Sequence, residues 1–159
     1  MGKLKGDIKV NYNLYIVNVE AAIYKDDKWL IIKRSEKEEH APGLISLVGG
    51  KVEANMAQDG ILEETLRREI MEEVGIEVSD TMHYLESKSF LLADGQVVVD
   101  VVFVCKYKSG EAKPVATDEV GEIYWMTCEE ILENEKALIW LKESIEKAEN
   151  VRLRLERGI

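Results

Sequence analysis

The stretch RREIMEEVGI, residues 67–76, carries the side chains with the clearest capacity for chemistry. It gathers Glu69, Glu72 and Glu73 in one place and then reaches a glycine. Carboxylates repel one another, so such a cluster either forms a solvated helix face or lies against a strong positive charge. Hard divalent cations such as Mg²⁺ prefer oxygen ligands of this kind. A metal site and a solvated face are therefore the two interpretations to separate.

These glutamates are predicted to lie on a helix that spans residues 61–74. Asp59 and Gly60 stand at its start, where short polar residues and glycine are common. Gly75 follows its end as the expected left-handed residue, and Ile76 can then fold back onto the helix.

The helical period places the carboxylates beside the buried face. With Arg68 at zero, Glu72, Glu69 and Glu73 lie at about 40°, 100° and 140°. The apolar positions fall between about 160° and 240°: Leu66, Ile70 and Val74. An acidic arc that borders the buried face suits the edge of a cleft, although the pattern E-x-x-E-E alone favours a solvated face. Arg68 and Glu72 also form an i,i+4 pair that can fix one carboxylate.

A glycine turn precedes the same helix. LVGG, residues 47–50, ends a short apolar run with Gly49 and Gly50, which indicates backbone that turns sharply or lies close to a ligand. Lys51 follows, either as a phosphate contact or as an ordinary charge after a turn. This context raises the weight of the metal-site interpretation.

The remaining pattern predicts strands at 13–24, 28–34 and 122–127, and a polar loop at 35–46. A hairpin is predicted across residues 82–108, with its turn at Asp94-Gly95. Residues 128–149 are predicted to form one helix, with core positions at Leu138, Leu141, Ile145 and Ala148. The tail at 150–158 fits either an edge strand or a continuation of that helix. Together these elements predict one domain over residues 1–159, of the α+β class or an α/β/α sandwich.

Composition limits the classes of partner. Hydrophobic residues make up 46% of the chain and charged residues 33%, which is typical of a soluble globular domain. The formal net charge of −10 repels nucleic-acid backbones and anionic membranes, so we expect neither as a partner. An anionic ligand would need a divalent cation as mediator.

Other compositional signals point to a reducing compartment. Cys105 and Cys128 lie far apart without a zinc or disulfide motif, and we expect both to be packed thiols. No apolar run reaches the roughly 18 residues of a membrane span. The N-terminus lacks an apolar signal core, which makes a cytoplasmic location the default.

GGKVE followed by LRREIMEEVGI resembles the signature of the Nudix hydrolases (MutT-like enzymes), Gly-x5-Glu-x7-Arg-Glu-apolar-x-Glu-Glu-x-Gly-apolar. The second half matches at every specified position: Arg68, Glu69, Ile70, Glu72, Glu73, Gly75 and Ile76. PGLISLVGG at 42–50 is similar to the family's approach to the glycines, and DEVGEIYWM at 118–126 to its late loop and tryptophan-bearing strand. The resemblance covers roughly residues 13–127 and implies a Nudix-like α/β/α sandwich with a mixed central β-sheet.

The first half of the signature departs from the family. Six residues after Gly50 stands Met56, where the pattern has glutamate, and eleven residues instead of seven separate it from Arg68. ANMAQDG therefore looks like a loop insertion of four residues that also removes the first signature glutamate. Asp59 and Glu53 are the candidate replacements.

The resemblance implies hydrolysis of a nucleoside diphosphate linked to another group. Bound Mg²⁺, or Mn²⁺ as the alternative, would lower the pKa of a coordinated water and bridge phosphate oxygens. The implied metal ligands are Glu69, Glu72, Glu73 and the carbonyl of Gly50.

The resemblance also implies supporting roles. Arg68 would orient the carboxylates, while Gly49, Gly50 and Lys51 would line the cofactor-binding turn. The general base is left open between Glu69 or Glu72 on the helix and Glu119 in the late loop.

Several other side chains are given non-catalytic roles. We expect His40 and His83 to be exposed, one of Tyr124 and Trp125 to lie in the core, and Trp29 and Trp140 to serve packing rather than binding.

Two functional classes follow. The first is a Mg²⁺-dependent pyrophosphohydrolase of a small-molecule nucleotide: a nucleoside triphosphate, ADP-ribose or a dinucleotide polyphosphate. The second is a Nudix-fold nucleotide-binding or regulatory module with weak or no turnover, motivated by the missing glutamate. An acidic structural domain is a third alternative, but it leaves the glycine turn unexplained. Residues 3–12 could add a strand that pairs two subunits, which would favour a homodimer.

Overall fold

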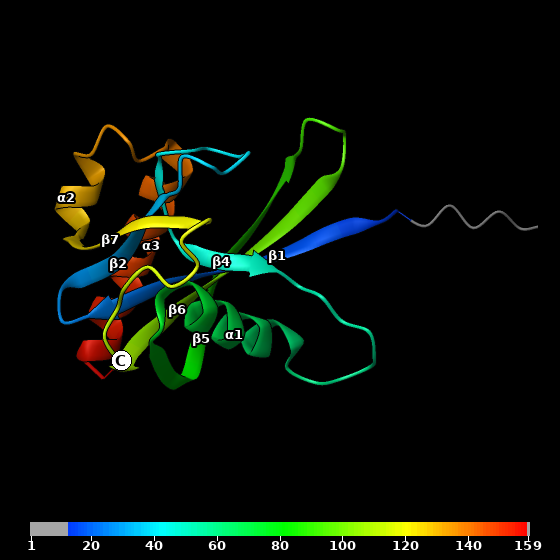
Figure 1. Cartoon of the computed structure of the whole chain (residues 1–159). Helices are drawn as coiled ribbons and strands as arrows, with labels where there is room; N and C mark the ends of the chain where they lie inside the picture. The colour runs from blue at the N-terminus through cyan, green and yellow to red at the C-terminus, as the bar shows by residue number, and fades with distance from the viewer. Residues whose placement is uncertain (1–12, 159) are drawn as a thin grey trace, which may run out of the picture.

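The computed structural model describes residues 13–158. Within them, helices pack on both faces of a mixed β-sheet (Figure 1). In chain order the elements are β1 (Tyr15–Lys25), β2 (Lys28–Arg34), β3 (Ile45–Ser46), β4 (Val48–Lys51), α1 (Ile61–Val74), β5 (Glu77–Leu91), β6 (Val97–Ser109), β7 (Val120–Thr127), α2 (Cys128–Leu132) and α3 (Ile139–Glu156).

Strand β1 is the centre of the sheet, because it pairs with β6 in parallel and with β2 and β4 in antiparallel register. The main path of the sheet runs β3-β2-β1-β6-β5, with β4 paired to β1 and β7 paired to β2. Strand β4 brings the glycine turn beside the middle of β1, with Val19 opposite Gly50 and Glu20 opposite Gly49. The predicted α+β class with a mixed central sheet is confirmed.

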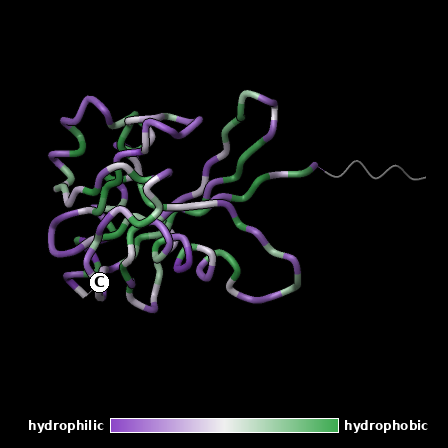
Figure 2. Tube along the Cα trace, viewed as in Figure 1, coloured by the Kyte–Doolittle hydropathy of each residue, from purple (hydrophilic) through white to green (hydrophobic). Residues whose placement is uncertain are grey.

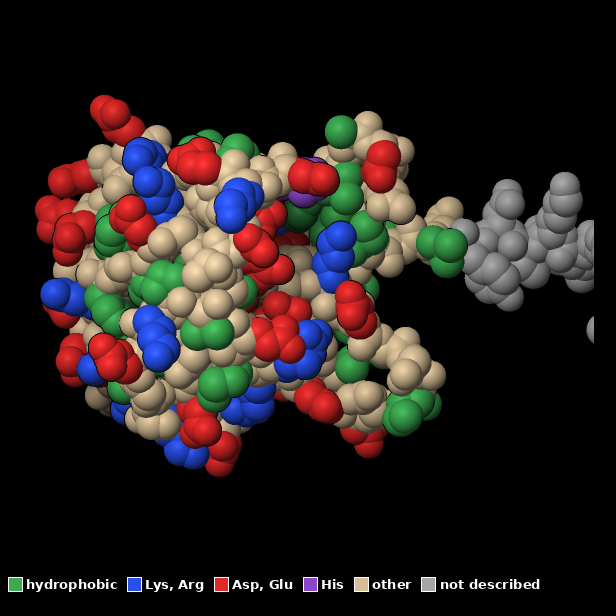
Figure 3. All heavy atoms as spheres, in the orientation of Figure 1, with side chains coloured by type: hydrophobic (Ala, Val, Ile, Leu, Met, Phe, Trp, Pro, Cys, Tyr) green, Lys and Arg blue, Asp and Glu red, His purple; other side chains and the backbone are tan. Residues whose placement is uncertain are grey.

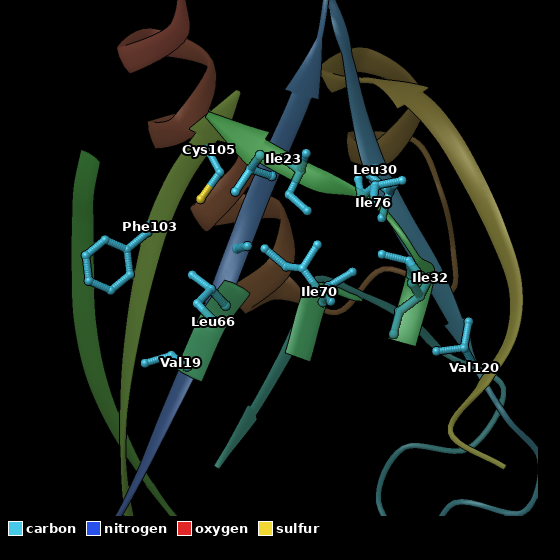
Figure 4. Packing of buried hydrophobic residues seen from close by; sticks show 14 residues of the cluster. Val19, Ile23, Leu30, Ile32, Leu66, Ile70, Ile76, Phe103, Cys105 and Val120 are labelled. Atoms are coloured by element: carbon cyan, nitrogen blue, oxygen red, sulfur yellow. The ribbon is translucent and has the colours of Figure 1, made fainter. Parts of the chain in front are cut away.

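Alternate residues of β1 face opposite layers, as the period of a strand requires. Val19, Ala21 and Ile23 pack in one core with helix α1, whereas Ala22 and Tyr24 pack in a second core with helix α3. Figure 4 shows the first core from close by, and in Figure 2 the hydrophobic stretches lie mainly where these layers meet. The strand reads as nearly continuous apolar sequence because both of its faces are covered.

Helix α1 has the predicted bounds. Its C-cap Gly75 has φ 71°, and the Gly75 N–H donates to the carbonyls of Ile70 and Met71 at 3.2 and 3.1 Å. Ile76 is 1% exposed and packs in the same core as the helix. At the start, Gly60 is the N-cap with φ 65° and no side-chain cap is present, so Asp59 does not fill that role.

The single helix predicted over residues 128–149 is wrong. Helix α2 ends at Leu132, and α3 begins only at Ile139 after an extended Leu138 (φ −73°, ψ 159°). Between them the chain returns to the sheet, where Ala137 forms a parallel bridge with Ile45. The hydrogen bonds of that bridge satisfy backbone that a continuous helix would have to satisfy internally.

The predicted hairpin is confirmed as β5 and β6, and Gly95 in its turn has φ 87°. The tail continues as helix α3 to Glu156, which settles the alternative between strand and helix. Among residues 13–158, no helix combines the length and apolar character that crossing a membrane requires. The strand predicted at residues 3–12, and with it the homodimer, lies outside the described residues.

Candidate active site

The two glycines of β4 allow helix α1 to approach the sheet closely. A Cβ added at Gly49 would overlap the carbonyl oxygen of Val19. A Cβ added at Gly50 would lie 2.6 Å from both carboxylate oxygens of Glu69. The glycine pair thus holds its predicted position close to other groups, and it puts the Gly50 backbone against a carboxylate of α1.

Glu73 is the most buried of the three glutamates, at 7% exposed. Its carboxyl group accepts a hydrogen bond from the Gly49 backbone and contacts the carboxyl of Glu119. Burial, and then the charges of Glu69 and Glu119, raises the pKa of Glu73 to about 9. Its Oε2 atom is buried and has no donor among residues 13–158. Such an orphaned carboxylate oxygen is costly unless a proton or a cation occupies its position.

Arg68 holds the other two glutamates. Its Nη1 lies 3.2 Å from Glu69 Oε1 and 3.2 Å from Glu72 Oε2, so the predicted i,i+4 pair is present. Burial raises the pKa of the Glu69 carboxyl against the opposing effect of Arg68, whereas the Glu72 side chain is 56% exposed. Burial lowers the pKa of Arg68, but the Glu72 hydrogen bond and the charges of Glu69, Glu72 and Glu53 outweigh it and raise that pKa. Of the two candidate replacements for the missing glutamate, Glu53 is therefore close enough to act on Arg68.

The late loop contributes one carboxylate to the cluster. Asp118 pairs with Lys37 at 3.3 Å, and Glu122 lies toward Lys33 at 4.0 Å, so both point to other partners. Glu119 contacts Glu73 instead, and its backbone carbonyl accepts a hydrogen bond of 2.9 Å from the Ser35 N–H. Of these three acidic residues, Glu119 is therefore the one that contacts the carboxylate cluster.

No set of three or more acidic, histidine or cysteine side chains within the described part of the chain is already gathered around a common point. Arg68 holds Glu69 and Glu72, while Glu73 turns to Glu119, which divides the carboxylates between two partners. The donor chemistry nevertheless fits a hard cation, because the group supplies two carboxylates with raised pKa values, one of which has an orphaned oxygen.

A cavity of about 310 Å³ opens beside these carboxylates. Its lining includes Gly49, Lys51 and Glu73 at the carboxylate cluster, and Phe90 and Trp140 at the hairpin and at the start of α3. Figure 3 shows acidic side chains around a hollow on this face of the molecule. The cavity gives a small anionic molecule access to the cluster.

Two predictions about aromatic residues can be checked at this cavity. Trp29 is fully buried and donates to Glu149 at 2.7 Å, so its packing role is confirmed. Trp140 was expected to pack, and this is wrong: it is 51% exposed and lines the cavity, because α3 starts only at Ile139. Trp125 lies against the first core and Tyr124 is 37% exposed, as the alternation predicted.

Of the two histidines, His40 is exposed as predicted, whereas the prediction of an exposed His83 is wrong. His40 is exposed and lines the cavity, and its carbonyl accepts a hydrogen bond of 2.8 Å from Arg34 Nε. His83 is half-buried on β5 opposite Val104.

Sequence reasoning missed three polar residues on the central strands: Asn18, Glu20 and Asp100. Asn18 and Glu20 line the cavity, and the fully buried Asp100 lies opposite Asn18 in the register of β1 and β6. A signal was present, since each interrupts a run of apolar, β-branched residues.

Comparison with known proteins places this geometry in a family. The family model described as NUDIX domain matches residues 14–148. A comparison with curated proteins gave no match. Among solved structures, the chain is similar to the MutT NUDIX hydrolase from Burkholderia pseudomallei, with 27% identity and a TM-score of 0.71 over 84% of this chain and 98% of that one.

Two further structures have the same fold. The MutT protein from Methanosarcina mazei Go1 is 26% identical, with a TM-score of 0.70 over 87% of this chain and 95% of that one. The NUDIX domain of Shewanella oneidensis NrtR is 21% identical, with a TM-score of 0.68 over 89% of this chain and 90% of that one. Since the family model spans most of the sequence, the chain belongs to the NUDIX domain family and is a Nudix hydrolase, an enzyme that acts on phosphoric anhydrides.

Proposed function

We propose that this chain is a divalent-metal-dependent pyrophosphohydrolase that cleaves a nucleoside diphosphate linked to another group. The observation that carries the proposal is the environment of Glu73. Its buried, orphaned Oε2 lies among the carboxyl groups of Glu69 and Glu119, beside the glycine turn and at the lining of the cavity. Mutually repelling carboxylates at a cavity wall are suited to hold a cation that an anionic substrate also needs.

Glu69, Glu72, Glu73 and the Gly50 carbonyl are the groups that would hold Mg²⁺, with Mn²⁺ as the alternative. Such an ion, when bound, lowers the pKa of a coordinated water and neutralises charge on the phosphate oxygens. The guanidinium of Arg68 pairs with Glu69 and Glu72 and so orients these two carboxylates before a metal ion binds. Burial of Glu73 supplies a carboxyl that gives up its proton only when a positive charge takes its place.

The general base is a residue that must accept a proton from the attacking water. Glu119 comes from a different element than the helix carboxylates and is not paired with a cation among residues 13–158, in contrast to Asp118. Glu72 is bound by Arg68 and Glu69 packs on Gly50, which suits both to ligand roles. We therefore place Glu119 first among the three candidates.

The substrate is a small nucleotide that fits beside Lys51 and Arg34, two cations that line the cavity; Arg34 also pairs with Glu38 at 3.5 Å, which leaves Lys51 as the first phosphate contact. A nucleoside triphosphate is the leading candidate, and the similarity to two MutT proteins supports it. ADP-ribose is an alternative, since the NrtR NUDIX domain was crystallised with that ligand.

A nucleotide-binding module without turnover is the second candidate. It is favoured by the missing signature glutamate at Met56 and by the division of the carboxylates between Arg68 and Glu119. Both candidates require the cavity, and only the first requires the glutamates to act in catalysis.

One comparison separates the two candidates. The purified protein is incubated with Mg²⁺ and a panel of nucleoside triphosphates, ADP-ribose and dinucleotide polyphosphates, and released monophosphate is measured. Glu73→Gln should lower turnover by about two orders of magnitude or more. Glu63→Gln, an exposed glutamate on the same helix, is the matched control and should stay within about twofold of wild type. If no member of the panel gives product, with wild type and Glu73→Gln alike, only the binding module would remain.

A further inference from the structure

Strand β5 forms an edge of the sheet, because the path β3-β2-β1-β6-β5 ends there and no strand among residues 13–158 pairs with its outer side. At 15 residues it is also the longest strand of the described chain. The unpaired backbone N–H and C=O groups of such an edge can pair with another extended chain, and proteins usually block them with bulges, charges or proline. The protection of β5 therefore decides whether its edge can bind a partner.

Only the first half of β5 is irregular. Its register with β6 shifts between Val78 and Met82 and again between Tyr84 and Glu86, whereas residues 86–91 pair with β6 without a shift. Bulges twist a strand locally and prevent a second chain from following it. The last six residues of β5 thus present a regular edge that is unpaired within the described part of the chain.

The turn end of the hairpin formed by β5 and β6 is almost free of charge. Residues 87–99 hold one lysine and one aspartate, and residues 13–17, at the start of the neighbouring β1, hold no charged residue. Four large apolar side chains are exposed at this end: Leu14, Tyr15, Phe90 and Leu91. An exposed apolar patch of this kind is suited to protein association.

Net charge favours this end for contact between two copies of the chain. Each copy carries −10, so most of the surface of one copy repels that of another. The hairpin projects from the rest of the molecule (Figure 1), so contact at its turn end keeps the two charged bodies apart. Repulsion falls off over about 8 Å at physiological ionic strength, which makes this separation effective. A second copy therefore meets the neutral patch with an identical neutral patch.

We propose that residues 86–91 of β5 pair antiparallel with the same segment of a second copy of this chain and form a homodimer with one continuous sheet. A twofold contact of this kind is self-complementary, because each copy offers the same surface to the other. It differs from the pairing through residues 3–12 that the sequence suggested, since it uses only described residues. It also needs neither metal nor turnover, so it goes beyond the proposed function.

The charges of the segment determine where the twofold axis lies. If both copies keep the same face of the sheet on the same side, the axis passes between one residue and its own copy. The middle of residues 86–91 allows Lys88 or Ser89 at that position. Two lysines directly opposite each other would be destabilising, which leaves Ser89 at the axis. Lys88 of one copy then lies opposite Phe90 of the other, and no like charges face each other.

The oligomeric state of the full chain tests the proposal. Six paired residues extend about 20 Å, a contact smaller than a standard interface of roughly 800 Å² per partner, so we expect a Kd of about 10–100 μM. Sedimentation velocity at about 5–500 μM should show the change from monomer to dimer. Ser89→Lys should weaken the dimer by more than tenfold, because it places two ammonium groups at the axis. Thr81→Lys, at an exposed position in the irregular half of the same strand, is the matched control and should dimerise as wild type does.

Disulfide cross-linking tests the position of the axis. Ser89→Cys should form a covalent dimer with copper phenanthroline in air, because residues directly opposite across two strands lie close enough for a disulfide. Thr81→Cys should cross-link no more than wild type, which already contains Cys105 and Cys128. Ser89 and Thr81 are both exposed, so circular dichroism should show that all four variants fold.

Three results would overturn the inference: a wild-type protein that stays monomeric at about 500 μM, a dimer that Ser89→Lys does not weaken, or equal cross-linking of Ser89→Cys and Thr81→Cys. The proposed hydrolysis is tested by a different readout, the release of monophosphate with Mg²⁺. Failure of either proposal therefore leaves the other standing.

Discussion

The carboxyl group of Glu69 packs directly on the backbone of Gly50, close enough that a Cβ at Gly50 would lie 2.6 Å from both of its oxygens. This contact joins the glycine turn of β4 to helix α1. It also brings the Gly50 backbone and the Glu69 carboxylate together next to Glu73, which lines the cavity. The candidate metal site therefore depends on the absence of a side chain at this position.

Gly50→Ala should reduce turnover while leaving most of the stability in place. The added methyl meets the end of a flexible side chain, so Glu69 can move aside at a cost of about 1–2 kcal/mol. The displaced carboxylate would then lower kcat by about tenfold to a hundredfold. Steady-state kinetics with Mg²⁺ and a urea unfolding curve measure the two effects.

Gly49→Ala is the matched control, and we expect it to lower stability more than Gly50→Ala does. Its Cβ would overlap the Val19 carbonyl and lie 3.0 Å from the Glu20 Cα, both of which are backbone atoms of the central strand. Backbone cannot rotate away, so we expect a loss of about 2–4 kcal/mol of stability. A Gly50→Ala variant that unfolds as readily as Gly49→Ala would show that the two contacts do not differ as described.

The stability of the metal-free protein should fall as pH rises. Burial and the charges of Glu69 and Glu119 raise the folded-state pKa of Glu73 to about 9, from an ordinary value of 4.5. The folded state then binds the proton more tightly than the unfolded state, and this contribution is full below the unfolded pKa and lost as pH rises through the folded pKa. Urea midpoints in EDTA should therefore decline between about pH 5 and pH 9.

Glu73→Gln should flatten this decline, because the amide cannot ionise. Added Mg²⁺ should raise the melting temperature of wild type more at pH 8.5 than at pH 6, since the ion competes with the proton for the same carboxyl. Parallel pH profiles for wild type and Glu73→Gln would show that another group controls the pH dependence.

The sequence predicted the elements whose signals are local. Helix α1 has the predicted bounds because an apolar stripe and the left-handed Gly75 are both encoded within it. The break at Leu132 was missed because helical periodicity continues through residues 133–138, while the bridge of Ala137 to Ile45 is a long-range contact. Trp140 follows this break at the start of α3 and lines the cavity, which local pattern could not show.

The residues of the candidate site also differ in whether a local sequence pattern could identify them. Arg68 and the glutamates of α1 were found because they share one helix, and the structure bears out the Arg68–Glu72 pair. The contact of Glu119 with Glu73 joins a loop and a helix, so sequence could name Glu119 only as one of several acidic residues. Glu20 and Asp100 become neighbours through the pairing of β1 with β6.

Arg68→Ala should affect activity more than stability. Arg68 is partly exposed, and exposed ion pairs contribute only about 0–1 kcal/mol. Its removal frees Glu69 and Glu72 from their shared partner, which should lower kcat/KM by about tenfold to a hundredfold. Arg67→Ala provides the contrast, since Arg67 donates to the backbone carbonyls of Ser79 and Asp80 on β5. We expect Arg67→Ala to lower the melting temperature and to keep kcat within about threefold of wild type. The reverse pattern would contradict the assigned roles.

Glu119→Gln tests the general base. If Glu119 accepts the proton of the attacking water, the amide should lower kcat by about 10²–10⁴-fold and leave KM nearly unchanged. The neighbouring Asp118→Asn is the control, because Asp118 pairs with Lys37 on the surface, and its kcat should stay within about twofold of wild type. Glu119→Gln also removes a charge that raises the pKa of Glu73, so its urea midpoint in EDTA at pH 8 should be at or above that of wild type. A kcat for Glu119→Gln close to that of Asp118→Asn would assign the base to Glu69 or Glu72, because those are the other carboxylates of the site that can accept the proton.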